Sequence, residues 1–164
     1  MKKLLLFLLL LLIFASCGPK KIYEKYIDIN NYLWSRETQF DFNINIENIE
    51  NDYDIFLEIR HTLYYIYDNL ALSIIVYYPN GEIRIKDYNI KMRDSKGTFY
   101  GDGMGDIFDR ETCIMKNIKF PEKGLYKFKI QNIMPRPVTG NIMQIGFVVK
   151  QSKEKLKTEV EKQD

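Results

Sequence analysis

Few side chains in this sequence could carry out chemistry. They are two cysteines (Cys17 and Cys113), a single histidine (His61) and a group of aspartates between Asp94 and Asp109. Proteins use thiol, imidazole and carboxylate groups as nucleophiles, general bases and metal ligands. A thiol can also be a point of covalent attachment. The sequence around each group decides between these uses.

Cys17 follows a basic start, an apolar run over residues 4–14 and two small residues, in the segment "FASC". The apolar run is about half the roughly 20 residues that a transmembrane helix needs, and the pattern is typical of a secretory signal peptide. The cysteine context resembles the lipobox of bacterial lipoproteins, in which the thiol receives a diacylglyceryl group. We therefore expect residues 1–16 to be removed and Cys17 to carry lipid. An ordinary signal peptide and an uncleaved anchor are the alternatives.

The charge balance bears on possible partners. The expected signal peptide contains two of the 24 basic side chains and none of the 22 acidic ones, so the mature chain is neutral. A protein that binds nucleic acid needs clustered positive charge, so we expect no nucleic acid partner. With Cys17 modified, Cys113 has no disulfide partner, and we expect it to be a small buried hydrophobic residue.

His61 stands at the end of a predicted strand in "EIRHTLYY". Neither Cys113 nor any serine lies in a recognisable nucleophile motif, and no Cys or His spacing is typical of a zinc site. We therefore expect His61 to be a solvated or hydrogen-bonded residue, and we predict no catalytic residue.

The segment "DSKGTFYGDGMGDIFDRE" contains four glycines and four aspartates. It lacks the helix and the Gly-Lys-Ser/Thr of a phosphate loop, and Cys113 occupies the place of the bidentate Glu of an EF-hand counted from Asp102. We expect a wide turn or β-bulge, with no metal and no cofactor. An irregular calcium loop from Asp102, Asp106 and Asp109 is the alternative.

Aromatic residues are concentrated in "LYYIYDNL", and the chain has one tryptophan, Trp34. Tyrosines in strands are most often partly buried, with a solvated hydroxyl. Two alternatives are a carbohydrate-stacking surface and a patch that contacts another protein.

An alternation of apolar and polar residues predicts the strands that position these groups. Phe40, Phe42, Ile44 and Ile46 lie two residues apart, as do Ile55, Leu57 and Ile59, and Tyr126, Phe128 and Ile130. Pro79-Asn80-Gly81 separates two further runs and predicts a hairpin. We expect an all-β domain over residues 22–150, an antiparallel, jelly-roll-like β-sandwich of about seven to nine strands without a major helix. Residues 17–21 are expected to be a lipidated tether, and residues 151–164 a charged tail, disordered or a frayed helix.

The order of these segments resembles the GldH gliding-motility lipoprotein family of Bacteroidetes. The resemblance rests on "YDIFLEIRHTLYYIYDNLALSI", "GTFYGDGMGD", "FPEKGLYKFKIQNIM" and "GNIMQIGFVV". His61 stands where the family more often has Asn, and Phe99 where Trp is common.

The resemblance implies a non-enzymatic, membrane-anchored envelope component of the gliding or associated secretion machinery. Its partners would be envelope proteins, with no small-molecule substrate. A glycan- or calcium-binding envelope lipoprotein is the alternative function. Because no acidic residue follows Cys17 until Glu24, the resemblance also implies an outer-membrane protein that faces the periplasm.

Overall fold

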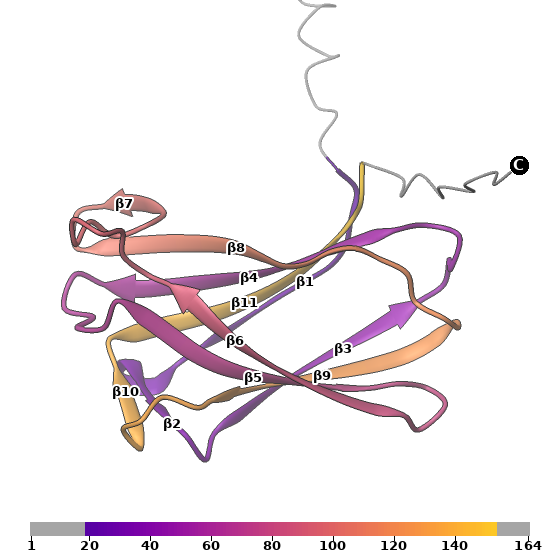
Figure 1. Ribbon diagram of the computed structural model, residues 1–164, viewed down its shortest axis with the longest axis horizontal. Helices are drawn as coiled ribbons and strands as arrows, with labels where there is room; N and C mark the ends of the chain where they lie inside the picture. Colours follow the sequence, from indigo (N-terminus) through magenta and orange to yellow (C-terminus); the bar gives the residue numbers. More distant parts are fainter. Residues whose placement is uncertain (1–18, 154–164) are drawn as a thin grey trace, which may run out of the picture.

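Alternating apolar and polar residues form two large antiparallel β-sheets packed face to face (Figure 1). The computed structural model describes residues 19–153. A three-residue 3-10 helix, η2 (Asn30–Tyr32), is the one helical element within these residues. The strands are β1 (Lys21–Asp28), β2 (Leu33–Ser35), β3 (Gln39–Ile46), β4 (Tyr53–Thr62), β5 (Asn69–Tyr77), β6 (Ile83–Lys91), β7 (Asp102–Met104), β8 (Ile107–Ile118), β9 (Gly124–Asn132), β10 (Val138–Gly140) and β11 (Ile142–Gln151).

The strand order is that of a jelly roll. One large sheet has the order β1-β11-β4-β8-β7 and the other β3-β9-β5-β6, so that most consecutive long strands alternate between the two layers. β2 and β10 pair with each other in a small two-stranded sheet. The predicted antiparallel, jelly-roll-like sandwich is therefore confirmed. The described residues form eleven strands instead of seven to nine, because β2, β7 and β10 have three residues each, too few to show alternation.

The predicted faces are confirmed in the long strands. On β4, Ile55, Leu57 and Ile59 are buried, while Glu58 and Arg60 lie on the outer face. The hairpin between β5 and β6 turns at Gly81, whose φ of 87° lies in the left-handed region that favours glycine.

Aromatic side chains join the two sheets in the core. The Phe147 ring on β11 lies with its centroid 5.1 Å from that of Phe42 on β3 and 5.0 Å from that of Phe128 on β9. All three are at most 1% exposed. The last strand, β11, is largely buried because it lies between β1 and β4 within a sheet.

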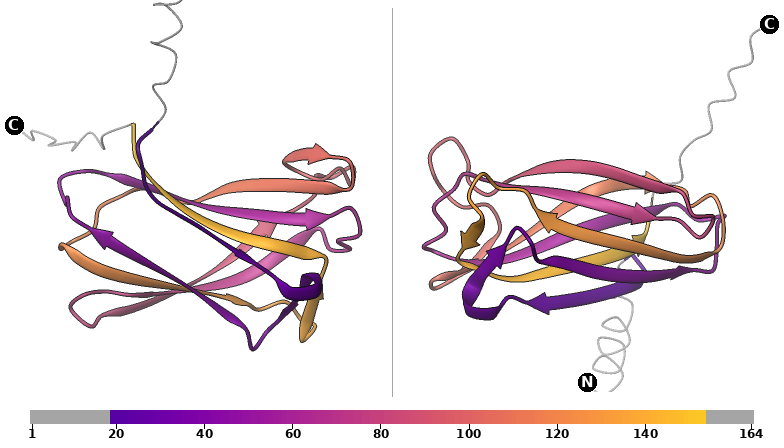
Figure 2. Two further views of the ribbon diagram at one scale, coloured as in Figure 1. Left: turned by 180° about the vertical axis from the view of Figure 1, so that it is seen from behind. Right: turned by 90° about the horizontal axis from the view of Figure 1, so that it is seen from below.

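The first and last described residues leave the sandwich side by side (Figure 2). The Gln151 amide donates to the Lys20 carbonyl at 2.8 Å, and the Ser152 amide to the Asp52 carbonyl at 2.8 Å. Gln151, the first residue of the segment predicted as a tail, is the last residue of β11.

Several predictions concern residues outside the described part of the chain. They are the signal peptide over residues 1–16, lipid on Cys17 and the tail beyond residue 153. Within residues 19–153, no helix has the length and apolar character needed to span a bilayer.

Candidate functional site

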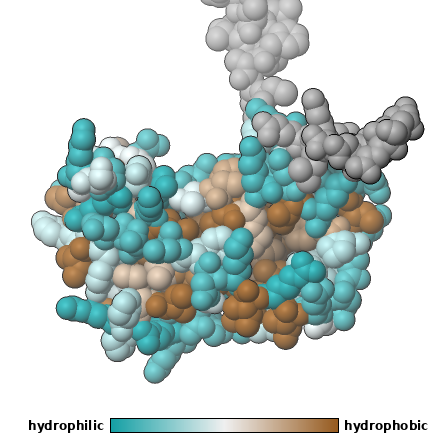
Figure 3. All heavy atoms as spheres, in the orientation of Figure 1, coloured by the Kyte–Doolittle hydropathy of each residue, from teal (hydrophilic) through white to brown (hydrophobic). Residues whose placement is uncertain are grey.

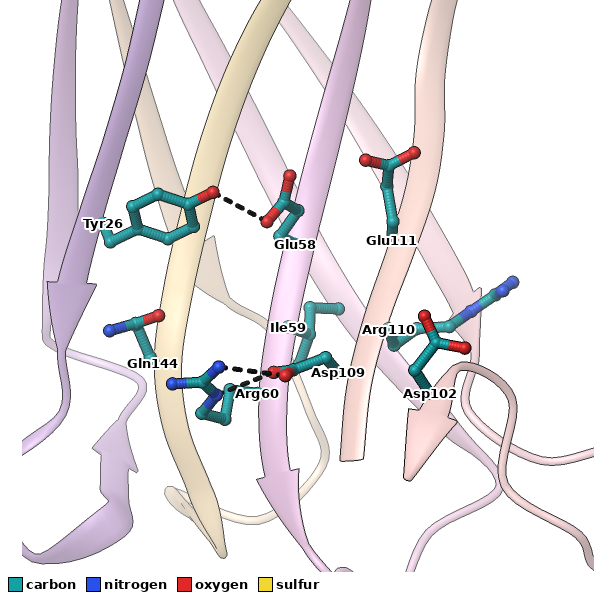
Figure 4. A pocket seen from close by; sticks show the side chains of 9 residues that line it. All are labelled: Tyr26, Glu58, Ile59, Arg60, Asp102, Asp109, Arg110, Glu111 and Gln144. Atoms are coloured by element: carbon teal, nitrogen blue, oxygen red, sulfur yellow. Dashed lines mark hydrogen bonds and ion pairs between the residues drawn. The ribbon is translucent and has the colours of Figure 1, made fainter. Parts of the chain in front are cut away.

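The outer face of the five-stranded sheet has a polar hollow of about 450 Å³ (Figure 4). All five strands contribute to it, because neighbouring strands bring residues of distant sequence into one row. Its lining residues are Tyr26, Glu58, Ile59, Arg60, Asp102, Asp109, Arg110, Glu111 and Gln144.

A bidentate ion pair joins β4 to β8 in this hollow. Arg60 and Asp109 are cross-strand partners, and the guanidinium donates through Nε to Oδ1 at 2.7 Å and through Nη2 to Oδ2 at 2.9 Å. The Arg60 guanidinium lowers the pKa of Asp109. Because both side chains are about half exposed, we expect the pair to contribute about 1 kcal/mol or less to stability. The ion pair fixes the positions of these two side chains on the outer face but contributes little to the stability of the fold.

A tyrosine lies across a glycine on the same face. Tyr26 on β1 is the cross-strand partner of Gly146, which is itself opposite Glu58. The Tyr26 hydroxyl lies 2.9 Å from Glu58 Oε2 and 2.8 Å from Glu24 Oε1. Burial, and then the two carboxylates, raise the pKa of Tyr26, so its hydroxyl stays protonated and donates. Sequence reasoning missed this contact, although an isolated glycine within a strand is a signal for close approach.

Carboxylates face one another across this hollow. Glu58 and Glu111 are cross-strand partners, and paired carboxylates can serve acid–base catalysis or metal binding. Each is held by a donor of the protein, however, Glu58 by Tyr26 and Glu111 by Lys150 Nζ at 3.0 Å. Among residues 19–153, no group of three or more His, Cys, Asp and Glu is arranged to hold a metal ion. The arrangement suits a charged contact surface.

His61 is buried and hydrogen-bonded, so of the two expected environments, solvated or hydrogen-bonded, the structure has the second. Its side chain has no exposed surface, and its ring centroid lies 4.6 Å from that of Phe99, 5.5 Å from Phe108 and 5.6 Å from Tyr65. Nδ1 lies 3.0 Å from the carbonyl oxygen of Thr62. Burial lowers the pKa of His61, which favours the neutral imidazole. His61 and Phe99, both departures from the family pattern, therefore contact each other.

The aspartate-rich segment forms turns and a short hairpin, as the wide-turn prediction expected. Asp94 Oδ1 accepts hydrogen bonds from the amides of Lys96 at 2.8 Å and Thr98 at 2.9 Å. Asp102 and Asp109 are cross-strand partners of β7 and β8. Since Arg60 already holds Asp109, this carboxylate is not arranged as a calcium ligand.

Cys113 and Trp34, the other two residues that the sequence analysis named, differ in burial. Cys113 is exposed on β8, opposite Phe56, so the expectation of a buried hydrophobic residue is wrong. Partial burial, and then Asp54, raise the pKa of its thiol. Trp34 is fully buried, and its Nε1 donates to the Thr38 carbonyl at 3.1 Å. Its ring therefore offers no carbohydrate-stacking surface.

Apolar side chains are exposed in the loop after β4 and in the β7–β8 hairpin, at the end of the sandwich farthest from Lys21. We call them the distal loop cluster, made up of Leu63, Tyr64, Ile66, Met104 and Ile107. Tyr64 and Ile66 are 67% and 65% exposed, and Met104 is 85% exposed. The Leu63 amide donates to the Asp106 carbonyl at 2.7 Å, which joins the loop after β4 to the turn between β7 and β8. This hydrogen bond holds together the two segments that carry the cluster.

Comparison with known proteins identifies the family. A model of the GldH lipoprotein family matches residues 21–149, which include nearly all of both sheets. The chain belongs to the GldH lipoprotein family. This membership confirms the resemblance noted in the sequence, and a lipoprotein family implies a lipid-anchored protein of the cell envelope.

Two relatives of this GldH-family chain bear names that refer to motility. The gliding motility lipoprotein GldH homolog of Christiangramia forsetii is 29% identical over 154 residues, which are 90% of this chain and 94% of the relative. The gliding motility lipoprotein GldH of Flavobacterium johnsoniae is 26% identical over 124 residues, 76% of each chain. A GldH-like role is therefore supported.

A solved structure with a related outline is the Yersinia pseudotuberculosis-derived mitogen. It is 7% identical, with a TM-score of 0.34, over 86% of this chain and 93% of the mitogen. At this TM-score the likeness supports no inference about function.

Proposed function

We propose that this chain is a non-enzymatic structural or assembly component of the gliding-motility machinery, or of its associated secretion machinery, that acts through contacts with envelope proteins. The observation that carries the proposal is the family match over residues 21–149. Residues 1–16 are removed, and Cys17 carries the lipid. A single acyl chain binds a membrane only marginally, whereas two or more anchor stably, which suits a diacylglyceryl group on Cys17.

The distal loop cluster is the surface that contacts the partner. A protein rarely leaves neighbouring large apolar side chains in water without a use for them, and Tyr and Met are enriched at protein interfaces. The ten residues of β11 separate this end of the sandwich from Lys20 by about 30 Å, at roughly 3.3 Å per residue. A lipid at Cys17 therefore presents the cluster away from the bilayer, where an envelope protein can reach it.

The domain faces the periplasm from the outer membrane. Support comes from the tether, in which Gly18, Pro19, Lys20 and Lys21 follow Cys17 without an acidic residue. Lysines near an anionic bilayer each contribute about 1 kcal/mol to membrane association. Protease treatment of intact cells tests this orientation. Digestion of the domain before the cells are permeabilised would show that it faces outward.

The contact role is tested by polar substitution of the cluster. The triple variant Tyr64→Ser, Ile66→Ser and Met104→Ser is introduced into a strain that lacks the chromosomal gene. We expect loss of motility or of the associated secretion, with the amount of protein, its membrane fractionation and its melting temperature unchanged. The matched control is the pair Leu125→Ser and Ile83→Ser, which are 59% and 54% exposed on other surfaces and should retain function. Full function of the triple variant would contradict the proposed contact surface.

A further inference from the structure

A cleft opens between the two sheets along the side formed by β6 and β8. Its volume is about 630 Å³, within the range of about 300–1,000 Å³ typical of small-molecule sites. This side faces the viewer in Figure 1, and Figure 3 shows hydrophobic residues along its middle with hydrophilic residues around them. The cleft is distinct from both the polar hollow and the distal loop cluster.

The floor of the cleft is apolar because it is part of the core. It includes Ile74 and Val76 of β5, Phe128 of β9 and Ile114 of β8, each at most 9% exposed. Ile114 is an extra residue in β8, since Met115 pairs with Ile55 and Cys113 with the adjacent Phe56. Such a bulge bends a strand and redirects its side chains. Here it directs Ile114 into the cleft.

The rim of the cleft is positively charged. Arg84 and Lys86 of β6, and Lys116 and Lys119 around the end of β8, line it, and none of its lining residues in the described part of the chain is acidic. Arg84 lies 2.7 Å from Glu82, and Lys119 lies 3.9 Å from Asp52, both outside the lining.

Protection of a sheet edge against aggregation explains only two of these four basic side chains. Arg84 and Lys86 are cross-strand partners of Val76 and Ile74, so they occupy the inner face of an edge strand. Inward-pointing charges on edge strands protect against aggregation. Lys116 and Lys119, however, come from the opposite sheet and converge on the same opening. Charge from both sheets indicates an anionic ligand.

A buried hydroxyl next to the rim has no hydrogen-bond partner among the described residues. Tyr88 lines the cleft two residues from Lys86 on the same face of β6, and its hydroxyl forms no hydrogen bond within residues 19–153. Buried polar groups are nearly always hydrogen-bonded, so an exception calls for a bound water or ligand. Burial raises the pKa of Tyr88, which keeps this hydroxyl protonated as a donor.

We propose that this cleft binds an anionic lipid, with one acyl chain on the apolar floor and the acidic headgroup at Lys86 and the Tyr88 hydroxyl. The neighbouring membrane is the source of the lipid. Lys116, on the rim, also lines a small hollow with Pro19, the first residue described, so the cleft reaches the end of the sandwich where the tether begins. The membrane as the source of the lipid rests on the proposed anchor at Cys17. The binding of an anionic lipid rests on the residues of the cleft and does not depend on that anchor.

The test uses a photoactivatable palmitate with a diazirine in its chain. The full chain is incorporated into phosphatidylcholine nanodiscs, irradiated with the probe and mapped by peptide mass spectrometry. We expect adducts to be concentrated on peptides of β5, β6 and β8, and unlabelled palmitate to compete with them. Lys86→Glu should reduce this labelling about three- to tenfold, as loss of a charge-assisted contact does. Tyr88→Phe should reduce it without lowering the melting temperature.

Lys91→Glu is the matched control, because it reverses a charge on the opposite face of β6 and should leave labelling unchanged. Adducts spread evenly over the domain, equal competition by the uncharged long-chain alcohol, or competition by an acidic peptide but not by palmitate would each overturn the proposal. Failure of the chain to associate with the nanodiscs would contradict the anchor at Cys17 alone, since cleft labelling can still be measured.

Discussion

The burial of His61 leads to a prediction about the pH dependence of stability. The ring is surrounded by Phe99, Phe108 and Tyr65 and has no exposed surface. Truncation in His61→Ala removes an aromatic ring from the core, which typically costs about 3–5 kcal/mol. His61→Phe keeps the ring and most of its volume, so we expect it to cost less than about 1.5 kcal/mol at pH 7.5.

The sign of the pH effect follows from the lowered pKa of His61. Below its ordinary pKa of about 6.5, the imidazole takes up a proton in the unfolded chain but not in the folded one. The contribution of the neutral His61 imidazole to stability is therefore fully present above about pH 6.5. It declines as the pH falls toward the pKa of His61 in the folded protein. Between pH 7.5 and 5.5 the loss from this one group is at most about 1.4 kcal/mol, or about 3–6 °C in melting temperature.

Urea unfolding of wild type and both variants at pH 7.5 and 5.5 measures these quantities. Carboxylates elsewhere contribute equally to all three proteins, so the difference between wild type and His61→Phe isolates the imidazole. We expect His61→Phe to lose less stability than wild type on acidification. An equal loss in both, or a change below 0.5 kcal/mol in His61→Ala as for a surface residue, would refute the buried neutral imidazole.

Three further predictions concern the core, the outer face and the anchor. Phe147→Ala should destabilise the protein by about 3–5 kcal/mol, because its ring joins the two sheets, and a loss below 1 kcal/mol in urea unfolding would contradict this. Gly146→Ala should cost about 1–3 kcal/mol, since its Cβ would lie 2.5 Å from the Tyr26 ring, whereas Gly140→Ala, with 3.7 Å to its nearest neighbour, should be close to neutral. Cys17→Ser should abolish radiolabelled palmitate incorporation and leave the protein in the soluble envelope fraction or uncleaved at the inner membrane; a mature, labelled variant would refute lipid attachment at this residue.

Local pattern was sufficient to predict the strands and most of their faces. Ile55, Leu57 and Ile59 point inward because successive side chains in a strand alternate between its two faces. The turn at Gly81 could be predicted for the same reason, as its conformation depends on residues next to it in the chain. The short strands β2, β7 and β10 could not be predicted, because three residues are too few to show an alternation.

The environment of single residues was decided by strands far apart in the sequence. Alternation places His61 and Arg60 on opposite faces, but two of the three aromatic rings that bury His61 come from the distant loop at Phe99 and from β8. Cys113 is exposed because β8 presents it on the outer face opposite Phe56. Neither outcome follows from a residue's own neighbours in the chain.

The sequence by itself determined the class of fold and the family, since both rest on the order and period of segments along the chain. The tertiary structure alone decided which groups meet. Tyr26 reaches Glu58 only because β11 places a glycine between β1 and β4. The basic rim forms only because β6, at the edge of one sheet, lies on the same side as the part of β8 that extends beyond its short pairing with β7 in the other sheet. Register and layer order are set by the packing of the whole core, so a one-residue shift would turn each of these side chains to the other face.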